Sequence, residues 1–234
     1  MPLSLDTRGV GDVTLVRCNG RIVAGGETES LRDHISGLLQ DRKAFVLHLG
    51  EVAFIDSSGF GMLVRLLTST RRVGGDLKLC NVPQDVHRVL KMTNLIRLFD
   101  THESEEDAVS AFYRRNKTSE RVAFAGPSIL CVDQSADVLA YLRELLRSAG
   151  YRVLTNSHLH DSLILIRATR PSLIILGPNL TASPRTQQNF RAACATAPVV
   201  ELGNEFSTLD SGQAASELLE KIRVRLSSQD GLAP

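Results

Sequence analysis

Residues 54–61, FIDSSGFG, lie where an apolar strand pattern changes into a helical one. The strand pattern before them is AFVLHL (44–49), and the segment after them repeats apolar residues at helical spacing from Phe60 to Thr70. Asp and Ser are preferred at such a junction because their side-chain oxygens accept the unpaired N–H groups of the first helical turn. The segment therefore predicts a strand-to-helix turn at the rim of a sheet.

Two hydroxyls, those of Ser57 and Ser58, follow Asp56 in this turn, although one cap would suffice. Gly59 and Gly61 keep the first helical turn bare, which would let the backbone of another protein approach. A phosphate on such a serine would meet free N–H groups and the positive helix end, and it would add about −1.5 to −2 charges. The turn is therefore either a simple helix cap or a modifiable contact site for another protein.

Strand and helix patterns alternate on both sides of this turn. We expect strands at 13–18, 44–49, 76–82 and 96–99. We expect helices that begin near Thr28, after Asp56, at Pro83 and at residue 105. Such alternation predicts an α/β fold with a mostly parallel sheet and crossover helices.

Residues 10–113 resemble the STAS family of anti-sigma-factor antagonists. The resemblance is carried, in the family's order and spacing, by GRI (20–22), LHLGEVAFIDSSGFGML (47–63), GGDLKLCNV (74–82) and VHRVLKMTNLIRLFD (86–100). It implies a four- or five-stranded sheet with helices mainly on one side, and binding to an anti-sigma factor that is a serine kinase. It also implies that phosphorylation of Ser57, or of Ser58 as second choice, releases that partner and so regulates transcription indirectly.

The resemblance further implies a surface that binds the partner. Its expected residues are Ile22, Val23, Asp56, Ser57, Ser58, Gly59, Phe60 and Gly61. Many family members carry an acidic residue, which helps to engage the kinase, where this chain has Val23. That departure favours the alternative hypothesis, a stressosome-like signalling scaffold or oligomerisation protein in which Ser57 only caps the helix.

The second half of the chain also alternates, with strand patterns at 128–133, 151–156, 172–177 and 197–203. It predicts a flavodoxin-like, doubly wound domain and resembles a degenerate response-regulator receiver domain. Gly177 stands at the position of the phosphorylated Asp, Gln134 follows Asp133 where a second acid is expected, and Gly203 replaces the switch hydroxyl. Phosphotransfer needs a carboxylate nucleophile and acidic Mg²⁺ ligands, so we expect docking or self-association instead.

The segment RRNKTSERVAFAGPS (114–128) is polar at its start and ends in Gly-Pro-Ser, which is typical of a linker. We therefore divide the 234 residues into two domains, which is an ordinary number for this length. The expected parts are a STAS-type domain (1–116), a linker (117–127), a receiver-like domain (128–228) and a tail (229–234).

Composition excludes several classes of function. A net charge of +1 gives no broad field for nucleic acid or a membrane surface. There is no signal-peptide pattern, and no apolar run approaches the roughly 20 residues that span a bilayer, so we expect a cytoplasmic protein. The 4 cysteines form no CxxC pair and are expected to be reduced and buried. We expect no catalytic residue, metal or cofactor; an enzyme or small-molecule carrier is the least favoured alternative.

Overall fold

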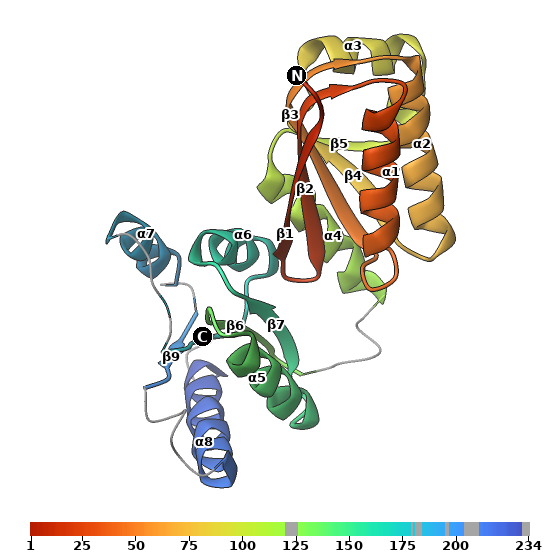
Figure 1. Cartoon of the computed structure of the whole chain (residues 1–234). Coiled ribbons are helices and arrows are strands. Elements are labelled where there is room, and N and C mark those ends of the chain that lie inside the picture. Colours follow the sequence, from red (N-terminus) through yellow and green to blue (C-terminus); the bar gives the residue numbers. More distant parts are fainter. Residues whose placement is uncertain (120–125, 179, 181–183, 195–196, 204–210, 231–234) are drawn as a thin grey trace. The chain divides into compact units, whose positions relative to one another are not determined.

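The computed structural model describes the chain except residues 120–125, 179, 181–183, 195–196, 204–210 and 231–234. The chain divides into two compact units, Met1–Phe112 and Tyr113–Pro234. No helix in the described part of the chain is both long enough and apolar enough to cross a membrane. Each unit is built around a sheet of its own (Figure 1).

The N-terminal unit has a five-stranded sheet with strand order β1-β2-β3-β4-β5. Its strands are β1 (Ser4–Val10), β2 (Val13–Ile22), β3 (Ala44–Ile55), β4 (Asp76–Cys80) and β5 (Asp100–His102). β1 pairs antiparallel with β2, and all other neighbours are parallel. The predictions of an α/β fold and a mostly parallel sheet are confirmed.

Helices connect and cover this sheet. They are α1 (Gly26–Leu38), α2 (Ser57–Arg72), α3 (Gln84–Met92), the 3-10 turn η1 (Leu95–Arg97) and α4 (Glu105–Ser119). α1 and α2 lie side by side on one face (Figure 1), and their apolar residues, such as Leu31 and Leu63, share one core with Leu47 and Leu79 of the strands. α4 lies on the opposite face, where the ammonium nitrogen of the buried Lys78 lies 4.9 Å from the centre of the Phe112 ring. Burial of these apolar stripes is the main stabilising term for the unit.

In this unit one strand was missed and two local predictions were wrong. β1 was not expected, because its seven residues, SLDTRGV, offer little apolar patterning; as an edge strand it is held by backbone pairing with β2. The strand expected at 96–99 is instead the turn η1, entered through Asn94 at φ 58°, and β5 follows it. α1 begins at Gly26, before the expected cap Thr28, whose hydroxyl donates to the Gly25 carbonyl (2.9 Å).

The C-terminal unit has a four-stranded, fully parallel sheet with strand order β7-β6-β8-β9. Its strands are β6 (Ser128–Val132), β7 (Arg152–Asn156), β8 (Leu173–Leu176) and β9 (Val199–Glu201), and its helices are α5 (Ala136–Ser148), α6 (Leu159–Thr169), α7 (Pro184–Cys194) and α8 (Ser211–Asp230). α5 and α8 share a core on one face, while α6 packs with α7 on the other (Figure 1).

The expected linker and tail overlap helices at their edges. α4 continues to Ser119, so the expected linker (117–127) begins as helix. Its central residues, 120–125, lie outside the described residues, as do residues 231–234 of the expected tail. α8 ends at Asp230, inside that tail.

Candidate functional site

The candidate site lies where β2 and β3 end. The two strands are parallel, and their last paired residues are Arg21 with Phe54 and Ile22 with Ile55. Because parallel strands end at the same edge of a sheet, the loop after β2 meets the turn after β3. The segment from Val23 and the segment from Asp56 therefore form one continuous surface.

Asp56 ties this surface together as the N-cap of α2. Its Oδ1 accepts a hydrogen bond from the Gly59 N–H (2.7 Å), and its Oδ2 accepts one from the Ala24 N–H (2.9 Å). Its own N–H donates to the Ile22 carbonyl (3.2 Å). One side chain therefore caps the helix and fixes the loop after β2.

These hydrogen bonds favour the charged carboxylate. The Ala24 N–H and then the Gly59 N–H lower the pKa of Asp56 below its ordinary value of 3.8. A carboxyl whose pKa is lower in the folded state stabilises the fold above its ordinary pKa, and this contribution is lost as the pH falls through the folded value.

We expect wild type to lose more stability than Asp56→Asn when the pH is lowered from neutral to below 3.8, the ordinary pKa of this carboxyl. Asn still offers an oxygen to the Gly59 N–H but does not titrate. Urea unfolding of both proteins at the two pH values measures the difference. Equal losses would contradict a charged, hydrogen-bonded Asp56.

Ser57 and Ser58 are the first two residues of α2, and both are exposed. Within the described part of the chain, neither hydroxyl hydrogen-bonds to another residue. The sequence did not decide whether the Asp or a Ser side chain caps the helix. In the structure the capping side chain is that of Asp56. Both hydroxyls face solvent at the positive end of the helix.

Three of the expected contact residues lie inside the fold. Ile22 is fully buried, Phe60 is 7% exposed, and Gly59 is buried against the β2 end. The side chains of Ile22 and Phe60 belong to the hydrophobic core beneath the turn. Of the expected contact residues, those that a partner can reach are therefore Ser57, Ser58 and Gly61, together with the half-exposed Asp56 and Val23.

The two glycines of the turn, Gly59 and Gly61, have different surroundings. A Cβ on Gly59 would lie 2.3 Å from the Ile22 carbonyl oxygen, whereas a Cβ on Gly61 would meet nothing within 4 Å. Gly59 thus serves close packing within the fold rather than the approach of a partner. Gly61 is exposed, as a contact position requires.

Gly59→Ala is expected to destabilise the N-terminal unit by about 1–3 kcal/mol, because the added methyl group collides with backbone. Gly61→Ala is the matched control and is expected to stabilise it by about 0.4–1 kcal/mol, since Ala restricts the unfolded chain. Urea unfolding followed by circular dichroism measures both changes. Equal effects of the two substitutions would contradict the packing of Gly59 on β2.

Sequence reasoning missed two exposed neighbours of the turn. Phe54 is 50% exposed at the end of β3, and the Arg21 guanidinium lies 5.5 Å from the centre of its ring. Aromatic residues and arginine are enriched among the residues that dominate protein interfaces. The signal was the alternation of β3, which places Phe54 on the face opposite the buried Ile55.

Two of the positions that the receiver resemblance singled out, 133 and 177, pack against each other in the C-terminal unit. Asp133 is fully buried, and its Oδ1 accepts a hydrogen bond from the Ser135 N–H (2.6 Å). A Cβ on Gly177 would lie 1.8 Å from the Asp133 Oδ2, so the carboxylate occupies the space of any side chain there. Gln134 and Gly203 are exposed.

The described residues show neither a metal site nor a reactive thiol. No group of three or more His, Cys, Asp or Glu side chains among them is placed to hold a metal ion. All four cysteines are free and buried, as expected. Burial raises the pKa of Cys18, Cys80 and Cys131 to about 12, so these thiols stay protonated at neutral pH.

One protein-family model matches the part of the chain that contains the candidate site. Residues 4–108 match the STAS domain. The matched span lies within the N-terminal unit and contains every residue of the turn and of the loop after β2. The expected STAS resemblance of this half is confirmed.

Several known proteins are similar to this STAS region. The anti-sigma F factor antagonist of Paenibacillus polymyxa is 27% identical over 47% of this chain and 95% of that protein. BtrV, a candidate anti-sigma factor antagonist of Bordetella bronchiseptica, is 26% identical over 43% of this chain and 88% of that protein. The crystal structure of a candidate anti-sigma factor antagonist from Thermotoga maritima is 25% identical, covers 46% of this chain and 92% of that one, and has a TM-score of 0.44.

Proposed function

We propose that the STAS region is an anti-sigma factor antagonist that binds an anti-sigma factor of the serine-kinase type and is released from it by phosphorylation of Ser57. The observation that carries the proposal is the exposed Ser57 hydroxyl at the start of α2, whose capping role belongs to Asp56. The names of the similar proteins support the class of partner. Ser58, also exposed, is the second choice for the phosphoacceptor.

The physical basis of release is local charge. The unmodified surface consists of small exposed groups at Ser57, Ser58 and Gly61, beside the half-exposed Val23 and the exposed Phe54. A phosphate on Ser57 adds about −1.5 to −2 charges. The charged Asp56 is its direct neighbour, so the modified turn would carry a concentrated negative patch. A partner that fits the bare turn would then face both bulk and unpaired charge.

The position of Ser57 at the start of α2 makes the modification compatible with the fold. A phosphate on this exposed residue would lie at the positive end of the helix, beside the turn that Asp56 already caps. The switch would therefore act on the partner and leave the STAS region folded. Because such a protein works by binding, we assign it no enzymatic activity, and we propose that it acts in the cytoplasm with its partner.

For the C-terminal unit we propose a flavodoxin-like, receiver-type fold that no longer transfers phosphate. The order β7-β6-β8-β9, numbered within the unit as 2-1-3-4, corresponds to the flavodoxin-like order without its last strand. The burial of Asp133 against Gly177 leaves no room for a carboxylate nucleophile. We therefore propose that this unit serves in docking or self-association, as the receiver resemblance implies for a domain without phosphotransfer.

The alternative function is a stressosome-like scaffold without a phosphoswitch. The observation that favours it is Val23, which is apolar and half-buried where many STAS proteins present an acid to the kinase. A scaffold of this kind would form stable oligomers. Its choice of partners would not depend on the charge at Ser57.

A pull-down from a lysate of the source organism, with wild type, Ser57→Ala and Ser57→Asp as baits, separates the two functions. Recovery of a kinase-type anti-sigma factor by wild type and Ser57→Ala, with loss by Ser57→Asp, would support the phosphoswitch. Recovery of the same partners by all three baits would favour the scaffold. Size-exclusion chromatography of the wild type then measures its oligomers.

A further inference from the structure

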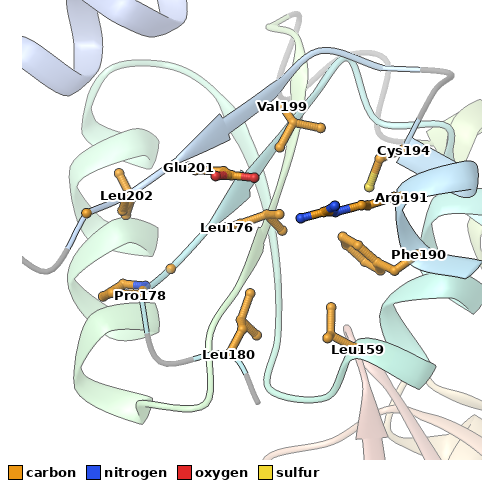
Figure 2. Close-up of a pocket in the computed structure, with 12 residues that line it drawn as sticks. Leu159, Leu176, Pro178, Leu180, Phe190, Arg191, Cys194, Val199, Glu201 and Leu202 are labelled. Atoms are coloured by element: carbon orange, nitrogen blue, oxygen red, sulfur yellow. The ribbon is translucent and has the colours of Figure 1, made fainter. Parts of the chain in front are cut away.

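The C-terminal unit contains a cavity of about 710 Å³ at the carboxyl ends of β8 and β9, beneath α7. Leu176 of β8 and Val199 of β9 face it from the sheet, and Phe190 faces it from α7 (Figure 2). In open α/β sheets, ligands bind beyond the carboxyl ends of the strands. The volume lies within the roughly 300–1,000 Å³ that small-molecule sites occupy.

Polarity in this cavity changes with depth. Phe190 (3% exposed), Cys194 (6%) and Leu159 (8%) form an apolar floor. Arg191 and Glu201 are exposed and stand at the rim. Burial raises the pKa of Cys194 to about 11, so its protonated thiol adds apolar surface rather than a nucleophile. A ligand would therefore place an apolar group inside and its charged groups at the mouth.

The two rim charges are opposite and come from different elements. Arg191 projects from α7 and Glu201 from the end of β9, and both side chains point toward the middle of the cavity (Figure 2). Neither makes an ion pair or side-chain hydrogen bond with any described residue, so their charged atoms are more than 4.0 Å apart. The cavity thus offers a cation and an anion that leave space between them.

We propose that this cavity binds a small zwitterion with an apolar side group, of the chemical class of free apolar α-amino acids. The guanidinium of Arg191 would donate to the ligand's carboxylate, with the geometry that favours Arg for such groups. The carboxylate of Glu201 would accept from the ligand's ammonium group. The apolar side group would pack on Phe190. A simple anion would be attracted by Arg191 but repelled by Glu201, and a simple cation the reverse, so each would gain less than a zwitterion.

Isothermal titration of the full chain with L-phenylalanine, L-leucine, phenylacetate and phenethylamine tests this proposal. We expect at least one of the amino acids to bind, and phenylacetate and phenethylamine, which each lack one charge, to bind at least about tenfold more weakly than L-phenylalanine. Arg191→Gln and Glu201→Gln are each expected to weaken amino-acid binding at least about tenfold. Arg185→Gln, an exposed arginine on α7 that does not line the cavity, is the matched control and should leave binding unchanged.

Several results would overturn the proposal. If neither amino acid binds, the ligand class is wrong. If phenylacetate or phenethylamine binds as tightly as the amino acids, the requirement for a zwitterion is wrong. If Arg191→Gln and Glu201→Gln bind like wild type while circular dichroism shows all variants folded, the site lies elsewhere. None of these results depends on Ser57 or on the anti-sigma factor.

Discussion

Ser57→Asp is expected to weaken binding of the anti-sigma factor by at least about 100-fold, because an unpaired carboxylate buried in an interface costs several kcal/mol. Ser57→Ala is expected to bind within about threefold of wild type, since a mutation that removes no specific interaction changes little free energy. The Ser57 hydroxyl makes no hydrogen bond with the described residues of its own chain. Isothermal titration with the purified partner, once the pull-down has identified it, measures these changes.

Two matched variants give this experiment its specificity. Ser36→Asp places the same charge on an exposed serine of α1 and should bind like wild type. Ser58→Asp tests the second candidate in the same turn. Loss of binding with Ser58→Asp alone would move the phosphoacceptor to Ser58. Unchanged binding with both turn variants would reject the phosphoswitch and support the scaffold.

Gly177→Asp introduces the carboxylate that phosphotransfer by the proposed receiver-type fold would need, and it is expected to destabilise the C-terminal unit by more than about 3 kcal/mol. The new side chain would begin 1.8 Å from the Asp133 Oδ2, in space that the fully buried Asp133 already fills. It would also bring a second carboxylate beside a buried one. Urea unfolding followed by circular dichroism measures the loss.

A double-mutant cycle shows whether Asp133 is the cause. Gly177→Ala alone should destabilise, because the methyl group meets the Asp133 carboxylate. Asp133→Ala alone also destabilises, because the Ser135 N–H loses its acceptor. The double variant should lose less stability than the sum of the two, since neighbouring residues are not additive. Additive effects would contradict a direct contact between residues 133 and 177.

Local sequence patterns determined the element types and the place of the candidate site. Apolar periodicity placed β3, α2 and the strands of the C-terminal unit, because a buried face repeats every two residues in strands and about every 3.6 in helices. The pattern Asp-Ser-Ser-Gly marked a strand-to-helix junction, and α2 begins there. That residue 177 is a glycine, and so offers no carboxylate, was also readable from the sequence alone.

Tertiary structure decided what local patterns do not encode. β1 is held by pairing along β2 rather than by its own apolar residues, and the short apolar run at 95–98 is a turn, because such runs suit several conformations. The roles within the turn also depend on contacts with distant residues. Asp56 accepts a hydrogen bond from the Ala24 N–H, and Gly59 packs against the Ile22 carbonyl. The packing of the Asp133 carboxylate against Gly177 likewise joins residues far apart in the chain. The fold also brings Arg191 of α7 and Glu201 of β9 to one cavity, although the two side chains form no ion pair. Such contacts follow from how strands and helices pack, which a one-dimensional pattern leaves open.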